Sequence, residues 1–261
     1  MKRFVFIVVL IAVSSSCRSG RSRYGVIEPV SELSIERMGI NRLPLECSGV
    51  SREGDQLTLR YRFESEGCLC TTEPILSFTE PQQWTALVNG VDVEPVRMRL
   101  QQNEEARFDI SGFLHDGENM IELRGSGELP AVTLSGEFDV VPSEQGGWRV
   151  KGEGVLELGS LVSQGLSYFA GSVAYNRRFE VPMRVGKRIL RLSGWQADSC
   201  SLWVNYEKVA DVTTESFEMN IGPYLNPGTN DVVVRLSARQ PASSEGRNPE
   251  DFGLFEAFTL E

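Results

Sequence analysis

A segment that occurs twice in the chain constrains its fold more than any other feature. The stretch RFDISGFLHDGENMIEL, residues 107–123, aligns without a gap with EMNIGPYLNPGTNDVVV, residues 218–234. The two copies share apolar residues, a glycine and an asparagine at matching positions: Ile110 with Ile221, Leu114 with Leu225, Gly117 with Gly228, Asn119 with Asn230, and Leu123 with Val234. An internal repeat at a separation of about a hundred residues indicates two similar domains rather than one large sheet.

The residues around both copies alternate between apolar and polar with the period of a β-strand. Apolar side chains take every second position in the longest such stretches: Val173, Tyr175, Phe179 and Val181, with Arg177 among them, then Cys200, Leu202 and Val204. This pattern is typical of half-buried antiparallel strands. Asn89-Gly90 predicts a tight hairpin, because both central residues of a type I′ turn need positive φ. We therefore expect an all-β protein made of two tandem antiparallel β-sandwich domains.

Breaks in the pattern divide the chain into five parts. The stretch PSEQGGW interrupts the strands near the middle, and a weakly amphipathic segment precedes the first clear strand. The expected parts are a signal peptide over 1–16, a tether and lead-in segment over 17–43, a first β-sandwich over 44–141, a linker over 142–148 and a second β-sandwich over 149–261.

The N-terminus has the pattern of an export signal. Lys2 and Arg3 precede an apolar run, residues 4–13, that is too short to be a stable membrane span. Three serines then precede Cys17, which resembles a bacterial lipobox although Ser14 stands where that signal usually has leucine. The resemblance implies cleavage before Cys17 and lipidation of that residue. The alternative is ordinary secretion, in which Cys17 is removed with the leader. Both interpretations predict export. Lipidation of Cys17 further predicts a lipoprotein at the outer membrane or the periplasmic face of the cell envelope.

Four further cysteines follow, and an exported protein can oxidise them. Cys68 and Cys70 face the same way if they lie on a strand, so Cys47 could pair with either, and the sequence leaves the pairing open. A zinc site would need more ligands than these three cysteines offer, so none is predicted. Cys200 shares a face with Leu202, which predicts a buried, inert thiol.

Charge and motifs exclude several classes of function. The formal net charge is −10 and the basic residues form no cluster, so the chain is not expected to bind nucleic acid. His115, the only histidine, lies in an HDG turn with no nucleophile motif around it. Neither Glu137 with Asp139 nor 250–251 has a context that sets it apart as the carboxylate pair of a glycosidase. We therefore expect no catalytic residue, no cofactor and no metal.

The order of motifs resembles a known family. A strand ending in VNG or VNY, then a hairpin of the form DI-x-x-x-L-x-x-GEN-x-I-x-L, is similar to the galactose-binding-like jelly roll of family-two glycoside hydrolases and carbohydrate-binding modules. The QGLSYFAGSVAYNRRFEVP run, the GEFDV strand at 136–140 and the closing FGLFEAFTLE resemble the C-terminal β-sandwich region of rhamnosidase-like glycoside hydrolases. The resemblance covers residues 44–261 and implies jelly-roll domains related to sugar binding. Two features depart from the family, because Tyr206 replaces its usual glycine and no catalytic barrel precedes these domains.

Aromatic and polar residues of the second half are the candidate sugar ligands. Sugar sites use an aromatic face ringed by hydrogen-bonding side chains. The candidates are Trp203, Asn205, Trp195, Arg177 and Tyr168. Trp203 alternates away from the expected core face, so it either forms an exposed platform or packs against the first domain. Arg177 falls on the expected inner face, where a guanidinium needs a carboxylate or carbonyl partner unless it lines a pocket.

The sequence thus predicts a non-catalytic carbohydrate-binding or glycoside-hydrolase accessory lipoprotein of the bacterial cell envelope. Its expected partners are a glycan and, through Cys17, the membrane. One alternative is a structural or adaptor lipoprotein that docks a protein partner. A second is a glycoside hydrolase with an unrecognised site, which would require a concave cleft with two carboxylates at catalytic separation.

Overall fold

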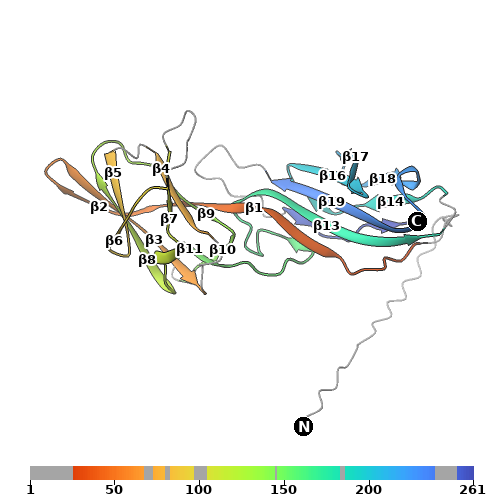
Figure 1. Ribbon diagram of the computed structural model, residues 1–261, viewed down its shortest axis with the longest axis horizontal. Coiled ribbons are helices and arrows are strands. Elements are labelled where there is room, and N and C mark those ends of the chain that lie inside the picture. Colours follow the sequence, from red (N-terminus) through yellow and green to blue (C-terminus); the bar gives the residue numbers. More distant parts are fainter. Residues whose placement is uncertain are drawn as a thin grey trace, which may run out of the picture.

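The computed structural model describes residues 26–67, 73–79, 83–96, 105–144, 146–182, 186–238 and 252–261. Its regular structure is almost entirely β-strand, arranged as two sandwiches that follow one another along the long axis of the molecule (Figure 1). The expected all-β class and antiparallel sandwich architecture are therefore confirmed. Cys17 and the leader lie outside the described residues, as do Cys68 and Cys70. None of the helices in the part of the chain that the structure describes is long and apolar enough to cross a membrane.

The first sandwich has two layers. One layer contains the C-terminal half of β1 (Ser34–Leu45), followed in order by β9 (Val132–Gly136), β4 (Ile75–Thr79) and β7 (Glu105–Asp109). The other layer has the order β10 (Phe138–Pro142), β11 (Trp148–Gly152), β3 (Gln56–Glu66), β8 (Gly117–Gly125), β5 (Trp84–Val88) and β6 (Val91–Val93), with β2 (Cys47–Glu53) paired to β3.

The second sandwich continues the same eight-stranded sheet. Its first layer contains the N-terminal half of β1 and then β13 (Phe169–Val181), β19 (Gly228–Ala238), β16 (Ser199–Val204) and β17 (Glu207–Val212). Its second layer consists of two short sheets, β12 (Gly159–Ser160), β20 (Gly253–Leu254) and β15 (Trp195–Gln196), and β18 (Phe217–Asn220), β14 (Ile189–Leu192) and β21 (Thr259–Leu260).

Each sandwich encloses a core of its own. The first core contains Leu43, Leu59, Tyr61, Leu76, Phe78, Ile121, Leu134 and Phe138, and the second contains Val173, Tyr175, Phe179, Leu190, Cys200, Leu202, Val234 and Leu260. Burial raises the pKa of the Cys200 thiol to about 12, with the charge of Asp211 adding to the effect. Cys47 is a free, exposed thiol.

The repeat reappears as the same polar network in both sandwiches. In the first, Asn119 is fully buried, and its amide nitrogen donates to the carbonyls of His115 and Gly117 while its oxygen accepts from Asn89 Nδ2 at 2.8 Å. In the second, Asn230 makes the corresponding bonds to Asn226, Gly228 and Asn205. A buried amide must satisfy its hydrogen-bonding groups, and these turns do so internally. The shared asparagines of the repeat therefore hold the hairpins together.

Strand β1 is shared by the two sandwiches. Residues 34–41 pair with β13 of the second sandwich, and residues 41–45 pair with β9 of the first. At the crossing, Gly39 lies opposite Gly171, and a Cβ built on Gly39 would stand 2.3 Å from the carbonyl oxygen of Ala170. Only glycine permits this approach. Likewise β11, which follows the expected linker, pairs with β10 and β3 of the first sandwich, so strand pairing does not follow the contiguous ranges expected from the sequence.

A buried ion pair joins the two sandwiches at this crossing. The Arg37 guanidinium, from the second-sandwich half of β1, donates to the carboxylate of Asp139 on β10 at 2.8 Å. The Arg37 side chain is 10% exposed and that of Asp139 is 1% exposed. Asp139 also accepts from the backbone N–H of Gly154 at 2.9 Å, and Arg37 contacts Glu153 at 3.0 Å. A charge this deeply buried is tolerated only because it is paired and hydrogen-bonded.

Candidate functional site

Trp203 lies on the outer face of β16, opposite the buried Cys200, Leu202 and Val204, as the alternation predicted. Its indole N–H donates to the Ser201 hydroxyl at 3.0 Å. The guanidinium carbon of Arg235, on the neighbouring strand β19, stands 4.7 Å from the centre of the ring. This cation–π contact covers part of the ring, so Trp203 belongs to a Trp203–Arg235 pair rather than forming a bare platform.

The other predicted ligands lie apart from Trp203. Trp195 is on β15, in the opposite layer, where its indole N–H donates to the carbonyl of Thr214 at 3.2 Å. Tyr168 packs edge-on against Trp148 at a centroid distance of 5.2 Å, against the core of the first sandwich. The five predicted residues are thus spread over several elements and do not converge on one cavity.

Asn205 and Arg177 have internal partners. The Asn205 amide nitrogen donates to the carbonyl of Tyr224 and to Asn230, and its oxygen accepts from the backbone N–H of Asp231. Asn205 is therefore occupied within its hairpin. The Arg177 guanidinium donates from Nη1 to the carbonyl of Phe258 at 3.3 Å. A backbone carbonyl is one of the partners that an arginine on the inner face requires.

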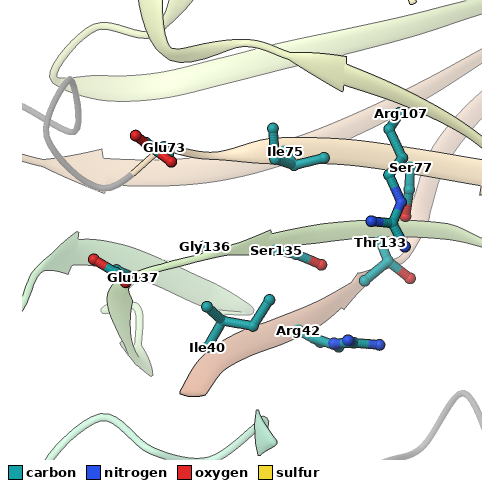
Figure 2. A pocket seen from close by; sticks show the side chains of 10 residues that line it. All are labelled: Ile40, Arg42, Glu73, Ile75, Ser77, Arg107, Thr133, Ser135, Gly136 and Glu137. Atoms are coloured by element: carbon teal, nitrogen blue, oxygen red, sulfur yellow. The ribbon is translucent and has the colours of Figure 1, made fainter. Parts of the chain in front are cut away.

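A pocket of about 250 Å³ lies instead on the outer face of the first sandwich. Its lining comes from four adjacent strands and the segments that flank them: Ile40 and Arg42 of β1, Thr133, Ser135, Gly136 and Glu137 of β9 and its end, Glu73, Ile75 and Ser77 of β4 and its start, and Arg107 of β7 (Figure 2). These positions alternate with Leu43, Leu76, Phe108 and Leu134, which face the core. We call this feature the outer-face pocket.

The strand register orders part of the pocket into two rows. Ser77 pairs with both Arg107 and Thr133, which makes the first row. Ile75 pairs with Ser135, which pairs with Arg42, and this is the second row. Because two residues span about 7 Å of a strand, the two rows are about 7 Å apart at the backbone. Glu73 and Glu137 lie beyond the second row, just outside the ends of β4 and β9, and Ile40 precedes Arg42 on β1.

Opposite charges therefore occupy opposite ends of the pocket. Figure 2 shows the carboxylates of Glu73 and Glu137 at one end and the guanidinium groups of Arg42 and Arg107 at the other, with Ile40 and Ile75 between them. Ser77 is only 6% exposed, so its hydroxyl lies at the buried floor, whereas both glutamates are exposed at the rim. Guanidinium groups supply donors, carboxylates supply acceptors, and hydroxyls supply both. The arrangement can hold a small polar ligand with an apolar side.

Sequence reasoning missed this pocket for a physical reason. Arginine, serine, threonine and glutamate at every second position are what any solvated strand face shows. Only the register, which brings β1, β9, β4 and β7 side by side, gathers them into a cavity.

The remaining catalytic candidates from the sequence, where the structure describes them, have local partners. The Nδ1 atom of His115 lies 3.0 Å from the carbonyl oxygen of Asp116 in its own turn, which can accept a hydrogen bond from the ring. Asp139 is committed to Arg37, and residues 250–251 lie outside the described residues. Across the described ranges, no group of three or more histidine, cysteine, aspartate or glutamate side chains is placed to hold a metal ion.

No family model and no curated protein match the chain. Its neighbours among solved structures include the Streptomyces avermitilis α-L-rhamnosidase complexed with L-rhamnose, with 12% identity, a TM-score of 0.31, and a match over 84% of this chain and 25% of that one. A glycosyl hydrolase family 2 member from Bacteroides cellulosilyticus has 12% identity, a TM-score of 0.23, and coverage of 79% and 28%. The apo form of the Pleurotus ostreatus lectin has 12% identity, a TM-score of 0.23, and coverage of 90% and 81%.

These neighbours include the two hydrolase groups that the sequence resembles. The chain spans about a quarter of the length of the two hydrolases. Identities and TM-scores this low say nothing about activity or ligand, so a function has to be argued from the chain's own residues.

Proposed function

We propose that the protein is a non-catalytic carbohydrate-binding lipoprotein of the bacterial cell envelope and that the outer-face pocket is its ligand site. The observation that supports this most directly is the mixed lining of the pocket. Ser77, Thr133 and Ser135 line it with hydroxyls, together with two isoleucines and four charged side chains. Sites for small polar ligands are concave and combine apolar walls with a few placed polar groups.

The shape suits a single sugar ring with its neighbours at the rim. A volume of about 250 Å³ is slightly below the usual range for drug-sized ligands, about 300–1,000 Å³. Isoleucine can cover the C–H face of a pyranose, while carboxylates and guanidinium groups form hydrogen bonds with its hydroxyls. A pocket for a purely apolar ligand would not need four ionised side chains.

The same geometry argues for binding rather than hydrolysis. Glu73 and Glu137 lie at the same end of the pocket (Figure 2). A glycosidase needs its two carboxylates on either side of the scissile bond, within a cleft that holds the substrate between them. Glu73 and Glu137 are instead exposed together at one end of the rim.

A glycan-array screen of the mature protein, with three variants, tests the proposal. Ser135→Tyr fills the pocket, Trp203→Ala removes the alternative surface on the second sandwich, and Arg52→Gln changes an exposed arginine on the β2 hairpin as a matched control. Binding that is lost only in Ser135→Tyr supports the outer-face pocket. Binding that is lost only in Trp203→Ala supports the carbohydrate-binding function but places the ligand site on the second sandwich instead of the outer-face pocket. No binding across the array refutes the function and favours the adaptor role.

The lipid anchor is tested separately. Cys17→Ser removes the residue that would carry the lipid, so the variant should leave the membrane fraction and lose incorporation of a labelled fatty acid. An exported protein that remains soluble with Cys17 intact would contradict the anchor and leave the carbohydrate site unaffected.

A further inference from the structure

The two ends of the outer-face pocket differ in chemistry, and this difference selects a kind of sugar. One end presents carboxylates, which only accept hydrogen bonds from a neutral sugar. The other end presents the guanidinium groups of Arg42 and Arg107, which only donate. A neutral ring would offer the glutamates its hydroxyls and the arginines only neutral acceptors, whereas a carboxylate would offer the arginines charge-assisted hydrogen bonds.

We propose that the outer-face pocket binds a hexuronate unit, with the sugar carboxylate at the arginine end and the ring hydroxyls at the glutamate end. This inference rests on the proposed carbohydrate function and deepens it. A guanidinium matches a carboxylate with two parallel N–H···O bonds, and its several donors allow it to hold a ligand oxygen alongside a protein partner. Charge-assisted bonds of this kind are about twice as strong as neutral ones.

The floor of the pocket supports the same orientation. Ser77 stands in register with Arg107 on one side and with Thr133 on the other, so two hydroxyl residues follow Arg107 in the same row. Ser77 is 6% exposed, and a buried hydroxyl must find a hydrogen-bonding partner. A carboxylate at this end can accept from the hydroxyls as well as from the arginine.

The glutamates and the overall charge limit the ligand to one carboxylate at this position. A second anionic group on the same ring would fall near Glu73 and Glu137 at the other end. The chain also has a net charge of −10, which opposes the approach of polyanions. Densely sulfated glycans are therefore excluded, whereas a uronate at a chain end is accepted.

The experiment compares each acid with its uncharged ester. D-galacturonate, D-glucuronate and the methyl ester of each are titrated into the mature protein, and dissociation constants are measured by NMR. The ester keeps the ring and the hydroxyls and loses only the charge. At least one acid should bind at least tenfold more tightly than its ester, because a hydrogen bond between charged groups is worth about that factor or more. Salt at about 1 M, where the screening length is about 3 Å, should reduce the difference.

Variants connect the effect to the arginine end. Arg107→Gln and Arg42→Gln should each weaken binding of the acid at least tenfold and leave binding of the ester unchanged. Arg107→Lys keeps the positive charge but loses the planar guanidinium that binds a carboxylate through two hydrogen bonds, so its affinity for the acid should lie between those of the wild type and Arg107→Gln. Arg52→Gln should change neither. Urea midpoints of all variants show whether the fold is retained, and Arg107→Lys serves as the readout if Arg107→Gln does not fold.

The outcomes separate the two proposals. Equal binding of acid and ester overturns the hexuronate inference and leaves the carbohydrate function standing. Preference for the acid that persists in both glutamine variants also overturns it, because the charge is then recognised elsewhere. Failure of all four sugars to bind, together with a silent glycan array, overturns both.

Discussion

The buried ion pair between Arg37 and Asp139 predicts how strongly the two sandwiches depend on each other. Asp139→Asn keeps the shape of the side chain and removes its charge. The Arg37 side chain, 10% exposed, then loses a partner at 2.8 Å, and removing one member of a buried pair costs about 3–5 kcal/mol. Glu153 still contacts Arg37 at 3.0 Å but is itself 38% exposed, so it offsets only part of the loss. We expect the free energy of unfolding to fall by about 3 kcal/mol.

Urea unfolding at pH 7, followed by tryptophan fluorescence, measures this loss. Trp84 and Trp148 report on the first sandwich, and Trp195 and Trp203 on the second. With a urea dependence of about 3 kcal/mol/M, the loss lowers the midpoint by about 1 M. Because Arg37 and Asp139 belong to different sandwiches, the variant should also separate the transition into two steps.

The matched control breaks an exposed pair. In Glu218→Gln the affected bond joins side chains that are 47% and 59% exposed, and such pairs contribute less than about 1 kcal/mol. If Asp139→Asn shifts the midpoint no more than Glu218→Gln does, the ion pair does not stabilise the junction and the reasoning is wrong.

Three further predictions follow from the described side chains. Cys200, whose pKa burial raises to about 12, should resist iodoacetamide at pH 8 until the protein unfolds, while Cys47 reacts in the native state, as peptide mass mapping would show. Asn230→Ala should cost about 3 kcal/mol in a denaturant titration, because it leaves buried groups of its turn unpaired; a loss below about 1 kcal/mol would contradict this. The hydrogen bond from Arg124 lowers the pKa of Glu122 in the folded protein, so the stability provided by the Glu122–Arg124 pair is present above pH 4.5 and is lost as the pH falls below it. Glu122→Gln should therefore reduce the dependence of the unfolding free energy on pH in acid, and an unchanged dependence would contradict a stabilising role for the pair.

The repeat predicted the antiparallel β-sandwich fold because it repeats the residues that fix the hairpins. Asn119 and Asn230 match in the sequence, and both are fully buried with the same hydrogen bonds. Asn89 and Asn205 are their partners and have positive φ, 51° and 49°. These hydrogen bonds join residues within one hairpin motif, so the residues that make them form a recognisable sequence pattern. The fold could therefore be inferred from that pattern.

Strand β1 escaped prediction because its junction-facing positions are not apolar. Ile35 and Leu43 pack against the second and first cores, and the positions in phase between them are Arg37, Gly39 and Asn41. Each has a long-range reason to be there: an ion pair, a close backbone approach, and a side chain that donates to two carbonyls at the junction. Alternation of apolar and polar residues gives no sign of such long-range partners. The sequence therefore predicted a lead-in segment where the structure has a central strand.

The shared strand also decides how the outer-face pocket relates to the rest of the sheet. Positions 34, 36, 38, 40 and 42 of β1 alternate away from both cores, and Ser34 lies in the same cross-strand row as Trp203, through Val233 and Asn176. The pocket and the Trp203–Arg235 pair therefore occupy the same side of one continuous sheet. The glutamate end of the pocket is the end nearer the second sandwich, because Ile40 precedes Arg42 on β1. If the pocket holds a sugar with its carboxylate at the arginine end, as we propose, a longer chain would run along β1 toward the second sandwich. Trp203 is six residues from Ile40 along β1, about 20 Å, and three strands across the sheet, about 14 Å, so only a chain of several sugar units would span the two sites.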